Sequence, residues 1–124
     1  MSYIYMIKCQ DGSYYTGIAK DIRKRMRQHF FKERSGAKYT RSRQAISLEA
    51  VWETDNWSEA GRMECFIKSL SRKEKEGLVK KPECLRDFYK KRKNIEPPSI
   101  KVVDAFGAFP LPLGEWLESG GGSL

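Results

Sequence analysis

Hydrophobic and polar positions near the start of the chain predict two β-strands joined by a tight turn. Residues 3–9 and 14–18 are rich in β-branched and aromatic side chains, and the polar, glycine-containing segment 10–13 separates them. This pattern is typical of a β-hairpin. Residues 46–53 alternate apolar and polar side chains, which predicts a third strand.

Helical periodicity dominates the rest of the chain up to residue 93. Apolar residues recur at three- and four-residue spacing through residues 21–31 and 58–70, which predicts two amphipathic helices. A third helix is expected after Ser71, because Ser71 and Glu74 have the spacing of a capping box. A short basic helix is expected over residues 83–93. This order predicts an α+β fold: a small, three-stranded, mainly antiparallel sheet flanked by helices.

A change of composition after residue 93 separates the predicted domain from a tail. Several prolines and a terminal glycine–serine run follow, as is typical of linkers and tails. We therefore expect one domain over residues 1–93 and a tail over residues 94–124.

The composition also indicates the cellular compartment of the protein. No stretch approaches the roughly 18 consecutive apolar residues that a membrane span needs, and the N-terminus lacks the features of a secretory signal. Three widely spaced cysteines favour reduced thiols over a disulfide framework. These features predict a cytoplasmic protein that does not associate with membranes.

Positive charge is clustered along the chain, whose formal net charge is +8. Residues 20–43 contain ten basic and two acidic side chains, and residues 68–93 contain eleven and four. Clustered positive charge attracts polyanions by releasing their counterions. Nucleic acid is one candidate partner on this ground, and a merely solvated basic surface is the other explanation.

Two triplets in the predicted hairpin carry a family resemblance. Residues 3–5 (YIY) end in Tyr5, and residues 15–17 (YTG) begin with Tyr15, ten residues later. They resemble the Gly-Ile-Tyr and Tyr-Ile-Gly triplets that name the GIY-YIG nuclease family. Neither departure from the family triplets removes a tyrosine.

Further positions strengthen this resemblance in the same order along the chain. Arg25 follows Tyr15 by ten residues, His29 lies one helical turn after Arg25, and Glu64 lies on the second predicted helix. The loop at residues 36–40 is similar to that of the small bacterial single-domain branch. The resemblance covers about residues 3–81 and implies a metal-dependent endonuclease.

The resemblance implies a role for each of these side chains. Glu64 would hold one Mg²⁺ or Mn²⁺, an ion that keeps several of its waters. Arg25 would grip the scissile phosphate with its planar donors. His29 would accept a proton, directly or through a tyrosine. Tyr5 is assigned to water activation with His29, and Tyr15 to a supporting role on the phosphate, with the order of the two tyrosines left open.

Nucleic-acid contacts are expected from the loop before the third strand, where four candidate residues lie. These are Lys38, Tyr39, Arg41 and Arg43. DNA is favoured over RNA, in a role such as repair or processing of damaged, branched or single-stranded forms, with no small-molecule cofactor. Two alternatives remain: a non-catalytic nucleic-acid-binding module with the same fold, and a basic interaction domain of α+β class.

The hairpin geometry can be predicted from strand parity. A two-residue loop would place Tyr5 and Tyr15 on opposite faces of the sheet. A three-residue loop, with Gly12 left-handed, pairs Cys9 with Ser13 and places both tyrosines on one face. One active site requires this longer loop or another of the same parity. Because residues four apart lie on one side of a helix, the arginine and histidine are both expected to point toward the tyrosines.

Overall fold

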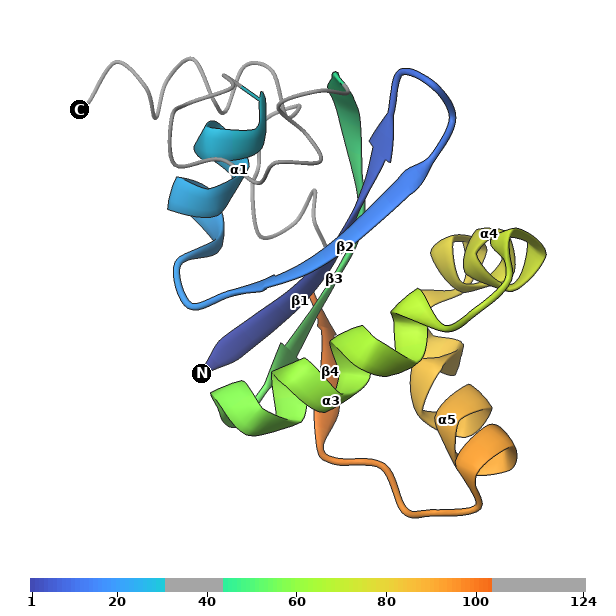
Figure 1. Ribbon diagram of the computed structural model, residues 1–124. Helices are drawn as coiled ribbons and strands as arrows, with labels where there is room; N and C mark the ends of the chain where they lie inside the picture. Colours follow the sequence, from blue (N-terminus) through green and yellow to red (C-terminus); the bar gives the residue numbers. More distant parts are fainter. Residues whose placement is uncertain (31–43, 104–124) are drawn as a thin grey trace.

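The computed structural model describes residues 1–30 and 44–103, which form an α+β fold as expected (Figure 1). One antiparallel sheet runs through the molecule in the strand order β2-β1-β3-β4. Its strands are β1 (Ser2–Cys9), β2 (Tyr14–Ala19), β3 (Ala45–Thr54) and β4 (Ile100–Val103).

The expected count of three strands is wrong, because the sheet has a fourth. Strand β4 lies within residues 94–124, the segment expected to be a tail, and pairs with the last four residues of β3 from Val51 to Thr54. A four-residue strand that follows two prolines has too little periodicity to be found in the sequence. Its conformation comes from the open edge of β3, which offers unpaired backbone groups.

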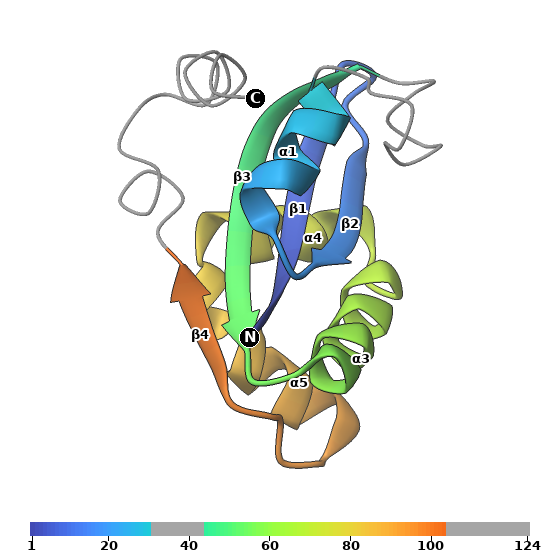
Figure 2. The ribbon, with the colours of Figure 1, turned by 90° about the vertical axis from the view of Figure 1, so that its left-hand side faces the viewer.

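Helices cover both faces of the sheet (Figure 2). The helix α1 lies on one face, and three α-helices with a short 3₁₀ turn lie on the other. They are α1 (Ile22–Phe30), α3 (Trp57–Lys68), α4 (Arg72–Lys80), η1 (Pro82–Cys84) and α5 (Leu85–Lys93). The capping box of Ser71 and Glu74 is confirmed. None of the helices in the described ranges is long and apolar enough to cross a membrane.

Side-chain alternation along β1 divides the apolar interior into two layers. Ile4 and Met6 face α3, α4 and α5, where they pack with residues such as Met63. Tyr5 and Ile7 face α1. The tyrosine therefore belongs to the layer between the sheet and α1, and the candidate site is built there.

Candidate active site

The turn of the β1–β2 hairpin sets the positions of the two tyrosines. The Cys9 amide donates to the Ser13 carbonyl at 2.8 Å, and the Gly12 amide donates to the Cys9 carbonyl at 2.9 Å. Gly12 has φ of 85°, a left-handed value that favours glycine. The three-residue loop is therefore confirmed. It places Tyr5 and Tyr15 on one face, with ring centroids 6.2 Å apart.

Helix α1 brings two further polar side chains to this face. Its first turn is capped by Asp21, whose carboxylate accepts a backbone hydrogen bond from Lys24. Ile22 and Met26 are buried against the sheet. Because Arg25 and His29 lie beside that apolar stripe and one turn apart, both project toward the tyrosines.

The side chains of His29 and Arg25 meet at the hydroxyl of Tyr5. Its oxygen lies 2.7 Å from Nε2 of His29, and Nε of Arg25 donates to it at 3.3 Å. The His29 ring also lies 5.4 Å from the ring of Tyr5 and 5.2 Å from that of Tyr15, between ring centroids. The expected orientation of Arg25 and His29 is confirmed. We call Tyr5, Tyr15, Arg25 and His29 the four-residue cluster.

Burial sets the protonation states inside the cluster. Burial, together with the positive charge of Arg25, lowers the pKa of His29 to about 4. Burial and the neighbouring Tyr15 raise the pKa of Tyr5 well above its usual value. At neutral pH His29 is therefore a neutral imidazole and Tyr5 a neutral phenol, and the tautomer of His29 decides which of the two donates in the hydrogen bond between them.

The four residues of the cluster differ in their exposure to solvent. Tyr5 and His29 are both 0% exposed, whereas Tyr15 and Arg25 are half-buried. A molecule that approaches from solvent therefore meets Tyr15 and Arg25 first, with the Tyr5–His29 hydrogen bond behind them.

Two positions that support the cluster were not assigned a role from the sequence. Gln28 is buried and accepts a hydrogen bond from Nη1 of Arg25 at 2.7 Å, which orients the guanidinium. Its spacing of three residues from Arg25 is the signal that could have found it. Gly17 lies opposite Tyr5 in the hairpin, and a Cβ there would lie 2.5 Å from the Tyr5 hydroxyl oxygen. Only glycine leaves room for the ring.

Helix α3 runs antiparallel to β2 along the other face of the sheet. At its start, Nζ of Lys20 lies over the ring of Trp57, 5.6 Å from the centroid. Just beyond its end, Arg72 donates to the carbonyl of Gly12 at 2.6 Å. The two ends of α3 thus lie beside opposite ends of β2. Glu64, near the middle of the helix, is therefore level with the middle of the strand.

Its neighbours show which way Glu64 faces. Phe66 contacts the ring of Tyr89 in α5, with ring centroids 4.9 Å apart. The 3₁₀ turn η1, which precedes α5, contacts β3 and β4. Two residues correspond to about 200° around a helix, so Glu64 lies on the side of α3 away from Phe66. Its side chain is 20% exposed, and its carboxylate lies 3.3 Å from Nζ of Lys68.

The structure thus brings four of the five candidate catalytic residues together and places the fifth in the other layer. Within the described residues, Glu64 forms no hydrogen bond with the four-residue cluster; its polar contact there is the ion pair with Lys68. The remaining candidates, Lys38, Tyr39, Arg41 and Arg43, lie outside the described residues.

The positions of the acidic residues show whether they could bind a divalent metal ion. The described ranges contain no group of three or more His, Cys, Asp or Glu that could enclose a metal. A single carboxylate nevertheless suits Mg²⁺, which retains most of its waters and takes one or two carboxylates. Glu64 is partly exposed and already holds a cationic group at 3.3 Å. These features fit an ion with one protein ligand.

The family follows from sequence similarity. Residues 1–77 match the model of the GIY-YIG catalytic domain, so this chain belongs to the GIY-YIG family, with its nuclease-like fold. A UPF0213 protein of Fusobacterium nucleatum is 40% identical over 101 residues, which cover 82% of this chain and 96% of that protein. One from Halobacterium salinarum is 45% identical over 78 residues, which cover 63% and 99% of the two chains.

One solved structure is also similar to this chain in sequence. The solution NMR structure of a UPF0213 protein from Bacillus halodurans is 43% identical in sequence and covers 64% of this chain and 84% of that chain, with a TM-score of 0.42. Like the relatives above, it is a small protein.

Proposed function

We propose that this protein is a metal-dependent endonuclease that hydrolyses phosphodiester bonds, in DNA rather than RNA. The observation that carries the proposal is the four-residue cluster, in which the buried Tyr5–His29 hydrogen bond and Arg25 share one hydroxyl oxygen. Phosphodiester hydrolysis needs a proton acceptor, a group that neutralises the phosphate and support for the leaving oxygen. The family match to a catalytic domain supports the same reaction.

Arg25 binds the scissile phosphate in this proposal. Its Nε donates to Tyr5 and its Nη1 to Gln28, so the plane of the guanidinium is held before substrate arrives. A planar, preorganised guanidinium suits the paired oxygens of a phosphate. Positive charge at this position offsets the charge that builds on the phosphate oxygens in the transition state.

The exposure of the two tyrosines favours the reverse of the order expected from the sequence. Tyr15 is the half-buried one, and we assign it the contact with the attacking water. Tyr5 lies behind it, where its hydroxyl holds Arg25 and His29 in place. In this proposal Nε2 of His29, in the tautomer that leaves it unprotonated, accepts the Tyr5 proton, and Tyr5 takes up in its place the proton that leaves the attacking water through Tyr15.

Glu64 would hold the single Mg²⁺ or Mn²⁺. Such an ion supplies charge neutralisation at the phosphate and lowers the pKa of a bound water. Glu64 is level with the middle of β2, where Tyr15 and Gly17 lie on the strand.

Charge supports the proposed substrate and location. Residues 20–43 and 68–93 carry the basic clusters, which suit a polyanion, and we assign phosphate contacts to the loop at residues 38–43. Repair or processing of damaged, branched or single-stranded DNA is the role we propose. None of Cys9, Cys65 and Cys84 forms a disulfide bond, which supports a reducing, cytoplasmic setting.

One observation favours a second candidate function. Glu64, the proposed metal ligand, lies in the other layer from the four-residue cluster. A non-catalytic binding module would keep the basic surface and show no dependence on metal.

Cleavage assays with the purified protein separate the two functions. End-labelled DNA and RNA, each as duplex, branched and single-stranded forms, are incubated with Mg²⁺, with Mn²⁺ and with EDTA. The nuclease proposal expects metal-dependent cleavage of DNA. Binding without cleavage of any substrate in either metal would favour the binding module.

A further inference from the structure

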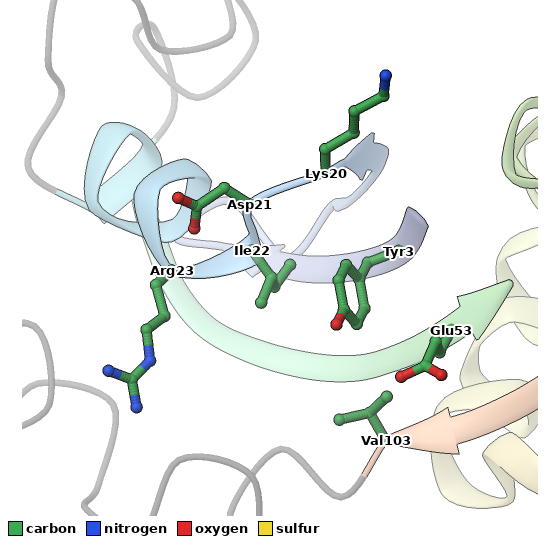
Figure 3. A pocket seen from close by; sticks show the side chains of 7 residues that line it. All are labelled: Tyr3, Lys20, Asp21, Ile22, Arg23, Glu53 and Val103. Atoms are coloured by element: carbon green, nitrogen blue, oxygen red, sulfur yellow. The ribbon is translucent and has the colours of Figure 1, made fainter. Parts of the chain in front are cut away.

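A pocket lies at Tyr3 and Ile22, on the face of the sheet that α1 covers (Figure 3). Its volume is about 560 Å³, within the roughly 300–1,000 Å³ range of small-molecule sites. Residues from β1, β3, β4 and the start of α1 line it. None of the functions assigned above uses it.

The walls of the pocket combine apolar surface with two polar groups. Ile22 and Val103 form apolar walls, and the side chains of Tyr3 and Glu53 point toward the space between them (Figure 3). Tyr3 and Glu53 are direct partners in the β1–β3 ladder, so the sheet itself holds them side by side. This arrangement suits a flat, partly apolar ligand with a polar edge.

The polar groups of Tyr3 and Glu53 are available to form hydrogen bonds with a ligand. Asp21, at the rim, already accepts the backbone N–H of Lys24 as a helix cap. Glu53 is half-buried, and neither its carboxylate nor the Tyr3 hydroxyl forms a hydrogen bond or ion pair with residues 1–30 or 44–103. A carboxylate is an acceptor only, so Glu53 selects ligands that present N–H or O–H groups. A half-buried carboxylate gains most from such a partner.

Spacing along β1 relates the pocket to the proposed reaction. Tyr3 and Tyr5 lie two residues apart on one face, which is about 7 Å along a strand. That length matches one nucleotide of an extended strand, or two stacked nucleotides at about 3.4 Å each. A nucleotide next to a phosphate held by Arg25 therefore reaches the pocket once its base is unstacked. Lys20 and Arg23 also line the pocket, and their charged ends point away from it (Figure 3).

We propose that this pocket binds one unpaired guanine base of the substrate strand, next to the cleaved bond. The ring of Tyr3 packs on the base, and the two oxygens of Glu53 accept the N1–H and N2–H groups of its Watson–Crick edge. Thymine and uracil place one N–H between two carbonyl oxygens, which the carboxylate repels. Adenine and cytosine offer one donor beside an acceptor. The inference rests on the nucleic-acid binding of the proposed function.

Titration of the full-length protein with guanosine, adenosine, cytidine and uridine 5′-monophosphates tests the pocket without any need for cleavage. The methyl NMR signals of Ile22 and Val103 report its occupancy. We expect guanosine monophosphate to shift both signals and to bind about tenfold or more tightly than uridine monophosphate, the discrimination typical of one bidentate contact. Absence of shifts at both residues, or equal affinity for all four nucleotides, overturns the proposal.

Two variants and a control assign the preference to the residues named. Glu53→Gln should bind guanosine and uridine monophosphates alike, and Tyr3→Leu should weaken all four nucleotides. Glu49→Gln removes the same charge from the same strand, where Glu49 accepts from Ser47 outside the pocket, and should keep the preference. A guanine preference that survives in Glu53→Gln contradicts the proposal.

The outcome is separable from that of the nuclease proposal. If DNA is cleaved but guanosine monophosphate shows no preference, the pocket inference fails and the nuclease function stands. If guanosine monophosphate binds through Glu53 and no substrate is ever cleaved, the pocket stands and the nuclease function fails.

Discussion

Replacing Gly17 with alanine tests how tightly the four-residue cluster is packed. The added Cβ would lie 2.5 Å from the hydroxyl oxygen and 2.7 Å from Cζ of Tyr5, and 3.0 Å from Cε1 of Tyr15. Tyr5 is fully buried, so its ring cannot withdraw without displacing its neighbours. The substitution therefore pushes the ring away from the position at which it meets His29 and Arg25.

The cost can be estimated from these contacts. Overpacking of a buried site costs about 1–3 kcal/mol in the free energy of unfolding. If the hydrogen bond between Tyr5 and His29 breaks, the unpaired groups cost a further ~1–3 kcal/mol. A displacement of about 1 Å in a catalytic constellation lowers the rate by about 10²-fold. We expect Gly17→Ala to lose both stability and cleavage by these amounts.

Urea unfolding and single-turnover cleavage measure the two effects, with Gly77→Ala as the matched control. A Cβ at Gly77 in α4 meets no atom within 4 Å. That variant should be about 0.5–1 kcal/mol more stable than the parent, because alanine is the better helix former, and should cleave at the parental rate. If Gly17→Ala unfolds at the parental urea concentration and cleaves normally, the packing argument is wrong.

Three further predictions concern the hydroxyl, the imidazole and the loop. Tyr5→Phe removes the oxygen shared by the cluster, so single-turnover cleavage should fall about 10²-fold while DNA binding persists; an unchanged rate would exclude a role for this hydroxyl. The pKa of His29 is about 4 in the folded protein and about 6.5 when unfolded, so the unfolded chain binds its proton first. Stability should be full above pH 6.5 and fall by about 3 kcal/mol as the pH drops toward 4. His29→Gln should lack that component in urea titrations, and an identical pH profile would contradict the assignment. Replacing Lys38, Arg41 or Arg43 with alanine, one at a time, should lower the slope of log affinity against log salt concentration by about one unit in binding assays on unrelated DNA sequences. Slopes equal to that of the parent would show that these residues do not contact phosphates.

The hairpin and the four-residue cluster show which features can be predicted from local sequence patterns. A single site for both tyrosines requires a turn of one parity, and the three-residue turn with Gly12 left-handed, which the structure confirms, has it. Four-residue spacing then aimed Arg25 and His29 at the same point. These features follow from strand and helix periods, which sequence carries directly.

Features that depend on distant parts of the chain could not be predicted in this way. Strand β4 exists because β3 offers it an edge, fifty residues away along the chain. The burial of Tyr5 and His29, and hence the low pKa of His29, arises from packing between two layers. Glu64 has the expected helix but lies in the opposite layer, because the buried residues of α3, such as Met63 and Ile67, pack on the face of the sheet away from the tyrosines.

The most direct test of the central claim is cleavage of labelled DNA by Glu64→Gln in Mg²⁺ and in Mn²⁺. The substitution keeps the shape of the side chain and removes the anionic charge that a hard cation requires. We predict a fall of about 10²-fold or more in metal-dependent cleavage, with DNA binding retained because the basic clusters are unchanged. Glu83→Gln, which removes the same charge from the exposed η1 turn, should cleave like the parent. Cleavage by Glu64→Gln at the parental rate in either metal would show that Glu64 does not hold the ion and would contradict the account.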